Sequence, residues 1–108
     1  MFAKIKIYRS CDHDFRFELV APNRAILGSS GQFKNRDDVL NAIRGLQAGS
    51  LECEYGVDSS GKHYFALCAE NGETVLRSQS YSSKSAAIEA QLFAVETAAE
   101  ARLVERDL

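Results

Sequence analysis

The feature that most constrains the fold of this chain is an internal repeat, in which the second half of the sequence follows the pattern of the first. A shift by 48 positions superposes residues of the first half on residues of the same kind in the second half. The aligned pairs include Phe17 with Phe65, Leu19 with Leu67, Ala21 with Ala69, Asn23 with Asn71, Phe33 with Tyr81 and Ala42 with Ala90. The 108 residues therefore form two diverged copies, one covering about 1–50 and the other about 51–108.

Hydrophobic periodicity predicts three strands followed by a helix in each copy. Apolar and charged residues alternate in 3–8 and in 51–57, as is typical of half-buried strands. The further predicted strands are 15–21, 25–29, 63–69, 73–78 and a last strand at 101–107. On the second strands we expect Phe15, Phe17, Leu19 and their counterparts His63, Phe65, Leu67 to face the interior.

Turn chemistry separates the second and third strands of each copy. In the first copy Pro22 pre-sets its own backbone angle, and Asn23 tolerates a left-handed conformation. The second copy has Asn71 followed by Gly72, a pair that favours tight turns between strands. Both segments therefore predict hairpins.

The two predicted helices begin at capping residues. Asn35 caps a helix from about Arg36 to Gln47, and Gly49 lies just past its end. Ser82 or Ser83 caps a longer helix that extends to about Ala99. The residues predicted to be buried are Val39, Ile43 and Leu46 in the first helix and Ile88, Leu92, Val95 and Ala99 in the second.

The tetrapeptide "CDHD", residues 11–14, contains four side chains that can each bind a metal ion. The shift that aligns the two copies places it on "SSGK", residues 59–62, which joins the equivalent strands without such ligands. A polar turn is therefore the shared property, and we predict neither a metal site nor a cofactor. The cysteines Cys11, Cys53 and Cys68 are odd in number and far apart, which favours reduced thiols.

Charge and hydropathy exclude several classes of protein. No apolar stretch is long enough to cross a bilayer, and the N-terminal segment lacks the features of a secretory signal. We therefore expect a cytoplasmic protein without a membrane partner. A formal net charge of -2 gives no strong attraction to nucleic acid.

The second copy carries a pattern that resembles the short domain of the YegP-like family of bacterial proteins. Its residues are Ala69, Asn71, Gly72, Val75, Ser78, Tyr81 and Lys84. The first copy has the same pattern with Arg24 in place of the glycine. The resemblance implies an α+β fold in which tandem β-β-β-α-β repeats form a single antiparallel-type sheet. It also implies two helices on one face, C-terminal strands that are swapped between the repeats, and no assigned biochemical role.

A lone copy is too small to be stable, since a single core below about 70 to 80 residues rarely supplies enough stability. We therefore expect one pseudo-symmetric domain over 1–108 with a shared interior. Lys4 and Lys6 correspond to Glu52 and Glu54, so equivalent strands carry opposite charge. This predicts that the charges favour pairing of unlike halves within one chain over pairing of like halves between chains.

No catalytic constellation is visible, so we expect no enzyme activity. His13 and His63 are the histidines, and neither belongs to a Ser-His-Asp arrangement or a nucleophile elbow. The glycine-containing segments lack the spacing of a phosphate-binding loop. Cys11 is the one candidate for an exposed reactive thiol.

Binding is the remaining class of function. On the sheet face away from the helices, Arg16 and Tyr64 occupy equivalent positions and could stack nucleic-acid bases. Glu18, Glu52 and Glu54 on the same face would repel phosphate. Apolar candidates for a partner or self-dimer surface are Val20, Ala66 and Cys68, together with Phe93, which could instead cover the final strand.

The function predicted from the sequence is that of a non-enzymatic protein-interaction module. The alternative is weak binding of single-stranded nucleic acid across the open sheet face. The candidate binding residues are Arg16, Val20, Tyr64, Cys68 and Phe93. The protein partner is unknown, and we expect a monomer or a weak homodimer.

Overall fold

The computed structural model describes residues 2–9 and 14–107. Its element order is the one that the sequence predicts, with three strands and a helix in each half and a final strand. The elements are β1 (Lys4–Arg9), β2 (Phe15–Val20), β3 (Ile26–Ser29), α1 (Arg36–Ala48), β4 (Glu52–Val57), β5 (His63–Cys68), β6 (Thr74–Ser78), α2 (Lys84–Glu100) and β7 (Arg102–Asp107).

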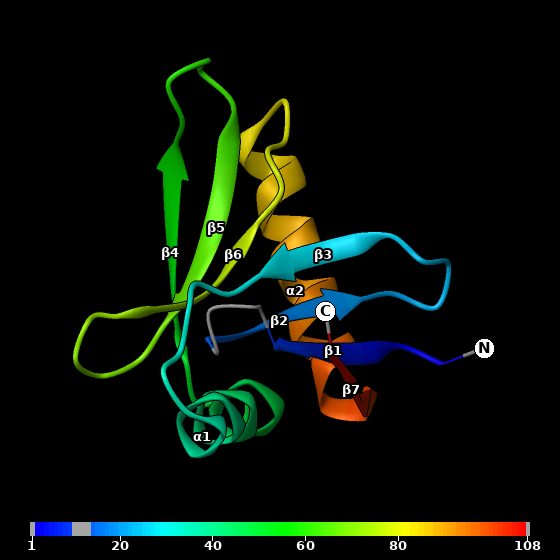
Figure 1. Ribbon diagram of the computed structural model, residues 1–108. Helices are drawn as coiled ribbons and strands as arrows, with labels where there is room; N and C mark the ends of the chain where they lie inside the picture. The colour runs from blue at the N-terminus through cyan, green and yellow to red at the C-terminus, as the bar shows by residue number, and fades with distance from the viewer. Residues whose placement is uncertain (1, 10–13, 108) are drawn as a thin grey trace.

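Within the described residues the strands form one seven-stranded sheet in the order β4-β5-β6-β3-β2-β1-β7 (Figure 1). All neighbouring pairs are antiparallel except β1 and β7, which run parallel. The two halves of the chain meet where β3 pairs with β6, through Gly28 opposite Ser78 and Ser29 opposite Arg77. The predicted α+β class, with a mostly antiparallel sheet and two helices, is confirmed.

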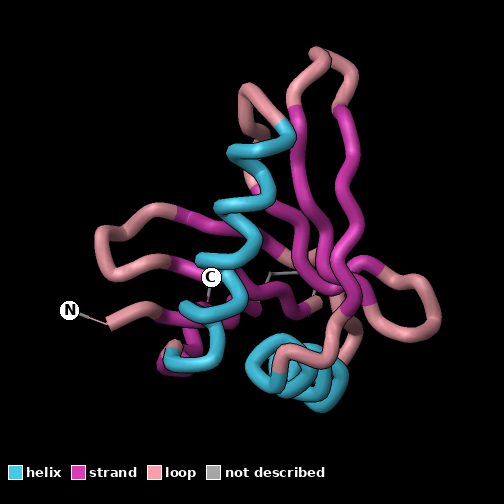
Figure 2. The backbone as a smooth tube through the Cα atoms, turned by 180° about the vertical axis from the view of Figure 1, so that it is seen from behind, coloured by secondary structure: helices cyan, strands magenta, loops and turns pink. Residues whose placement is uncertain are grey.

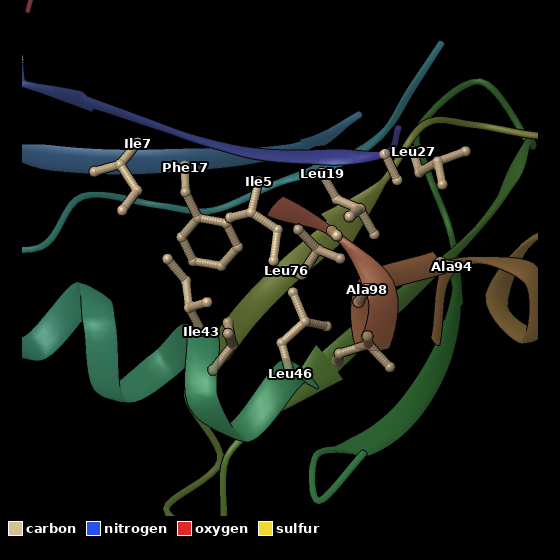
Figure 3. Packing of buried hydrophobic residues seen from close by; sticks show 14 of the residues in the cluster. Ile5, Ile7, Phe17, Leu19, Leu27, Ile43, Leu46, Leu76, Ala94 and Ala98 are labelled. Atoms are coloured by element: carbon tan, nitrogen blue, oxygen red, sulfur yellow. The ribbon is translucent and has the colours of Figure 1, made fainter. Parts of the chain in front are cut away.

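A shared hydrophobic core lies between the sheet and the helices. Figure 3 shows Phe17 and Ile5 from the sheet close to Ile43 and Leu46 from α1. The same cluster contains Leu76 of β6, so both halves contribute to one interior. The core side chains of β2 and β5 are those predicted by alternation: Phe17, Leu19, Phe65 and Leu67 are buried, whereas Phe15 and His63 are partly buried.

Helix α1 has the predicted ends and the predicted buried face. The side chain of Asn35 accepts a hydrogen bond from the Asp38 N–H, at 2.9 Å, which satisfies one of the free donors of the first turn. Gly49 ends the helix in the left-handed conformation, with φ of 70°. The buried residues of this helix are Val39, Ile43 and Leu46.

Helix α2 is capped by Ser83 as predicted, but its predicted buried face is wrong. Leu92 is 59% exposed and Ala99 is exposed, while Ile88 and Val95 are only partly buried. The helix is apolar on nearly every side, so its periodicity does not identify the face that packs inward. The buried residues are Ala87, Ala94, Thr97 and Ala98. Small side chains occupy this face and allow close packing of the backbone.

Local contacts recur at equivalent positions of the two halves. Phe15 forms a β-bridge with Phe33, and His63 forms the equivalent bridge with Tyr81. The Ser30 hydroxyl accepts a hydrogen bond from the Phe17 N–H at 2.8 Å. The corresponding bond, from the Phe65 N–H to the Ser78 hydroxyl, measures 2.9 Å.

The hairpin turns match in geometry although they differ in sequence. Gly72 has φ of 86° and Arg24 has φ of 73°. The left-handed residue of the first turn is therefore Arg24, and the prediction that assigned this conformation to Asn23 is wrong. The Asn23 side chain instead accepts a hydrogen bond from the Ala25 N–H, and Asn71 accepts one from the Glu73 N–H, each at 3.0 Å.

The opposite charges of β1 and β4 do not bring these strands together. Strand β1 lies between β2 and β7, while β4 lies at the other edge of the sheet. The two halves do pair within the chain, but they join through β3 and the end of β6. The prediction that the charges of Lys4, Lys6, Glu52 and Glu54 favour this pairing is therefore wrong, because these residues do not lie opposite one another. Neither of the two described helices is long and apolar enough to cross a bilayer.

Candidate functional site

The predicted base-stacking pair is not assembled in the structure. Arg16 lies on β2 and Tyr64 on β5, and β3 and β6 separate these two strands. At about 4.8 Å per strand, their backbones are roughly 14 Å apart. The Tyr64 ring already carries the Arg77 guanidinium, whose carbon lies 4.0 Å from the ring centroid. The two residues therefore do not form one stacking platform.

Val20 and Cys68 do not form the predicted apolar patch. Val20 is 7% exposed, Ala66 is 7% exposed and Cys68 is 4% exposed. Cross-strand neighbours explain the burial of Val20, which lies opposite Lys4 on β1 and Ile26 on β3. A lysine can cover such a residue with the methylene part of its side chain. The expectation of an apolar surface at these positions is wrong.

Phe93 is the predicted binding residue that presents an apolar surface to solvent. Its side chain is 49% exposed, so the final strand does not cover it. Phe2, which is 57% exposed, and Pro22 lie with Phe93 around a groove of about 800 Å³. Glu96, Glu100 and Arg102 add charged groups to the lining of this groove. We call this surface the Phe93 groove.

The Phe93 groove joins parts of the chain that are far apart in sequence. Phe2 precedes β1, Pro22 lies in the β2–β3 turn, and Phe93 comes from α2. Figure 2 shows α2 crossing the back of the sheet beside the strands of the first half. The Arg102 guanidinium carbon lies 3.6 Å from the centroid of the Phe2 ring, and both residues line the groove. Sequence patterns do not reveal this convergence.

A second hollow, of about 630 Å³, lies on the sheet face away from the helices. Lys4 and Lys6 from β1 and Arg24 from the β2–β3 turn give it a basic lining. Glu18 is the acidic residue in the same lining. We call this surface the basic hollow. The alternating lysines were visible in the sequence, whereas the position of Arg24 depends on how the hairpin folds over the sheet.

The turn between β4 and β5 is organised by Asp58. Its carboxylate accepts hydrogen bonds from the Ser60 and Lys62 N–H groups and from the Ser60 and Ser80 hydroxyls, at 2.6–3.0 Å. The Ser80 and Ser60 hydroxyls are the main cause of a pKa well below the ordinary value for aspartate. The bond to Ser80 also ties this turn to the loop before α2. These contacts indicate a structural carboxylate.

The predicted turn at "CDHD" lies largely outside the described residues, since the structure describes only Asp14 of the four. In the described ranges, no three or more His, Cys, Asp or Glu side chains lie close enough to hold a metal ion. Burial raises the pKa of the Cys53 thiol, which disfavours the reactive thiolate. His63, at the start of β5, is partly buried and exchanges backbone hydrogen bonds with Tyr81.

The fold and these surfaces define a small α+β sheet domain that carries the Phe93 groove and the basic hollow. A family profile described as a domain of unknown function, DUF1508, matches residues 58–105. A UPF0339 protein of Pseudomonas aeruginosa is 34% identical over 87 residues, which are 78% of this chain and 79% of that protein. One from Mannheimia succiniciproducens is 33% identical and covers 70% of each chain. The chain therefore belongs to the UPF0339, or YegP-like, family.

Two solved structures share the fold. The solution structure of YegP, a protein of unknown function from E. coli, has a TM-score of 0.88 at 21% identity and covers 99% of this chain and 95% of that one. The solution structure of a UPF0339 protein from Shewanella oneidensis has a TM-score of 0.86 at 22% identity, with 99% and 93% covered. At these identities the similarity establishes the architecture alone.

Proposed function

We propose that this protein is a non-enzymatic cytoplasmic module that binds a protein partner through the Phe93 groove. The observation that carries the proposal is the half-exposed state of two phenylalanines, Phe2 and Phe93, that line one hollow. Aromatic side chains in a concave apolar surface are common anchors of protein interfaces. Exposed aromatic surface also costs solubility, so its presence in a small domain favours a binding role.

The charges near the groove indicate the chemistry of the partner. Glu96 and Glu100 line the groove, and Arg102 already lies over the Phe2 ring. A partner with an apolar side chain that packs against these phenylalanines, and with basic residues around it, fits both features.

Substitution of Phe93 by aspartate tests the proposal with a control on the same helix. Leu92, the adjacent residue, is 59% exposed but points about 100° away around the helix. Proteins that bind the immobilised wild-type chain would be identified from a cell lysate, purified and tested again. We expect Phe93→Asp to weaken direct binding by at least about tenfold and Leu92→Asp to preserve it. Equal binding by Phe93→Asp and wild type would contradict the proposal.

Binding of single-stranded nucleic acid in the basic hollow is the second candidate. It is favoured by the two lysines and the arginine that line the same hollow as Tyr8 and Phe2. Lys4→Ala with Lys6→Ala would then weaken retention on single-stranded DNA and reduce its dependence on salt. Retention that is unchanged by both substitutions would contradict this candidate.

We also infer that the domain arose as two β-β-β-α units, with β7 of the second unit returned to β1 of the first. The common spacing of the paired bridges and of the serine hydrogen bonds supports this origin. In this interpretation β7 is the exchanged strand, and it pairs in parallel with β1 of the first unit. Expression of residues 1–50 or 51–108 alone is expected to give no cooperative unfolding. A monomeric half with a cooperative melting transition would contradict the inference.

A further inference from the structure

The two edges of the sheet are not equivalent. The outer side of β1 is covered by β7, which pairs with it in parallel along its whole length. Its counterpart β4, in the second copy of the repeat, ends the sheet in the part of the chain that the structure describes. Figure 1 shows β4 beside β5 with its other side open. In the repeat proposed above, β4 corresponds to β1. No described strand pairs with the outer side of β4 in the way that β7 pairs with β1.

The different lengths of the helices explain the vacancy. The two helices begin at equivalent positions of the repeat, Arg36 and Lys84, but α2 has 17 residues and α1 has 13. Helix α2 therefore continues for about one more turn and leads directly into β7. Gly49 ends α1 earlier in a left-handed conformation, and the chain turns into β4 itself. No described segment of the first half covers this edge.

The backbone of β4 presents hydrogen-bonding groups toward the vacant place. The Asp58 N–H donates to the Lys62 carbonyl at 2.8 Å, so this pair begins the hydrogen-bonded alternation between β4 and β5. The same alternation directs Gly56 and Glu54 toward β5. It leaves the N–H and C=O groups of Cys53, Tyr55 and Val57 directed outward. An extended segment could pair with these groups.

The side chains of β4 specify what such a segment must carry. Glu52 and Glu54 are exposed on the sheet face away from the helices, and this edge strand has no basic residue. Cross-strand pairs of opposite charge are favourable, and like charges directly opposite are unfavourable. A second copy of β4 would therefore be a poor occupant because its glutamates would face these. An added segment with lysine or arginine at alternate positions therefore complements the charge of Glu52 and Glu54.

The other face of β4 carries Tyr55 and Val57 and adjoins α2, whose Lys84 ammonium nitrogen lies 5.7 Å from the centroid of the Tyr55 ring. Tyr55 and Val57 are 39% and 58% exposed. The Tyr55 hydroxyl lies 3.4 Å from the Gln91 side-chain oxygen, so this part of α2 borders the edge. Apolar side chains between the basic residues of an added strand would pack against Tyr55 and Val57.

We propose that β4 binds an extended segment of a partner protein by adding it to the sheet as an eighth strand. The segment runs parallel to β4, as β7 runs parallel to β1, and alternates basic with β-branched apolar residues. Its basic residues lie beside Glu52 and Glu54, and its apolar residues face Tyr55 and α2. This surface is separate from the Phe93 groove.

The test uses the full chain and a fluorescently labelled seven-residue peptide in which lysine alternates with valine. We expect saturable binding and slower amide hydrogen exchange at Cys53, Tyr55 and Val57 in the complex. A peptide with glutamate in place of lysine is expected to bind at least about tenfold more weakly. The variant with both Glu52→Lys and Glu54→Lys should reverse this preference.

Substitution of Val57 separates strand addition from simple charge attraction. Val57→Pro removes an outward N–H without removing a bond to β5, whereas Val57→Thr keeps the N–H and serves as the control. We expect the proline variant to lose peptide binding and the threonine variant to retain it. Binding without protection of the three amides, or protection that appears with protein concentration and no peptide, would overturn the proposal. Phe93→Asp should have no effect on peptide binding, so the two proposals fail independently.

Discussion

Gly28 of β3 and Leu76 of β6 lie in contact across the junction of the two halves. A β-carbon added at Gly28 would lie 2.9 Å from Leu76 Cγ and 3.0 Å from the Arg77 carbonyl oxygen. Both distances are shorter than an ordinary van der Waals contact, and Leu76 is fully buried. The absence of a side chain at Gly28 therefore lets the two halves approach closely enough to share a core.

Gly28→Ala is predicted to destabilise the domain. Overpacking of a buried contact costs about 1–3 kcal/mol, and the neighbouring carbonyl cannot move without weakening the β3–β6 pair. Urea denaturation followed by circular dichroism would measure the change. Gly31→Ala is the matched control, since a β-carbon there meets no atom within 4 Å. Equal stabilities of the two variants would contradict the role assigned to Gly28.

Gln47 is predicted to hold the end of α2 against α1. Its side-chain amide donates to the carbonyl oxygens of Ala98 at 3.2 Å and Ala101 at 3.1 Å. Gln47→Ala leaves both part-buried acceptors without this donor and should cost about 1–3 kcal/mol of unfolding free energy. Chemical denaturation would test this, with the exposed Gln79→Ala as the control. A loss no larger than that of the control would show that water replaces the donor.

The course of the chain could be predicted from the sequence because alternation and capping act locally. The strand at β1 follows from the alternation of Ile5 and Ile7 with lysines, and the ends of α1 follow from Asn35 and Gly49. The inward face of α2 could not be predicted in this way. Its alanines pack inward because the sheet and α1 leave little space, and that space exists only in the folded molecule.

Only part of the candidate site could be predicted from the sequence. Phe93 aligns with Gly45 when the sequence is shifted by 48 positions, so its size is unusual at that position. Phe2 and Pro22 carry no comparable signal, because their proximity to Phe93 results from the packing of α2 on the first half. The vacant edge at β4 was equally hidden, since it depends on which strand β7 joins.

Stability is predicted to fall at acid pH through Asp58. Its folded-state pKa is lowered, chiefly by the Ser80 and Ser60 hydroxyls, so the unfolded chain binds a proton more readily. The stabilisation is present above the unfolded pKa, which is about 3.9, and is lost as the pH falls toward the lower folded value. Melting temperatures measured from about pH 6 to pH 2 should therefore decline less steeply for Asp58→Asn than for wild type. Glu70→Gln, in an exposed loop, is the control; a decline that is unchanged by Asp58→Asn would contradict the assignment.

Arg24→Gly is predicted to stabilise the β2–β3 hairpin. Arg24 has φ of 73°, a conformation that costs a residue with a β-carbon about 1–2 kcal/mol, while glycine loses about 0.5–1 kcal/mol of chain entropy on folding. The equivalent turn already has Gly72 with φ of 86° and the same two backbone hydrogen bonds. The net gain should be about 0.5–1 kcal/mol in urea denaturation. Arg24→Ala separates the backbone effect from the loss of charge, because alanine keeps the strained conformation and should give no gain. Equal stabilisation by both variants would assign the effect to the arginine charge in the basic hollow instead.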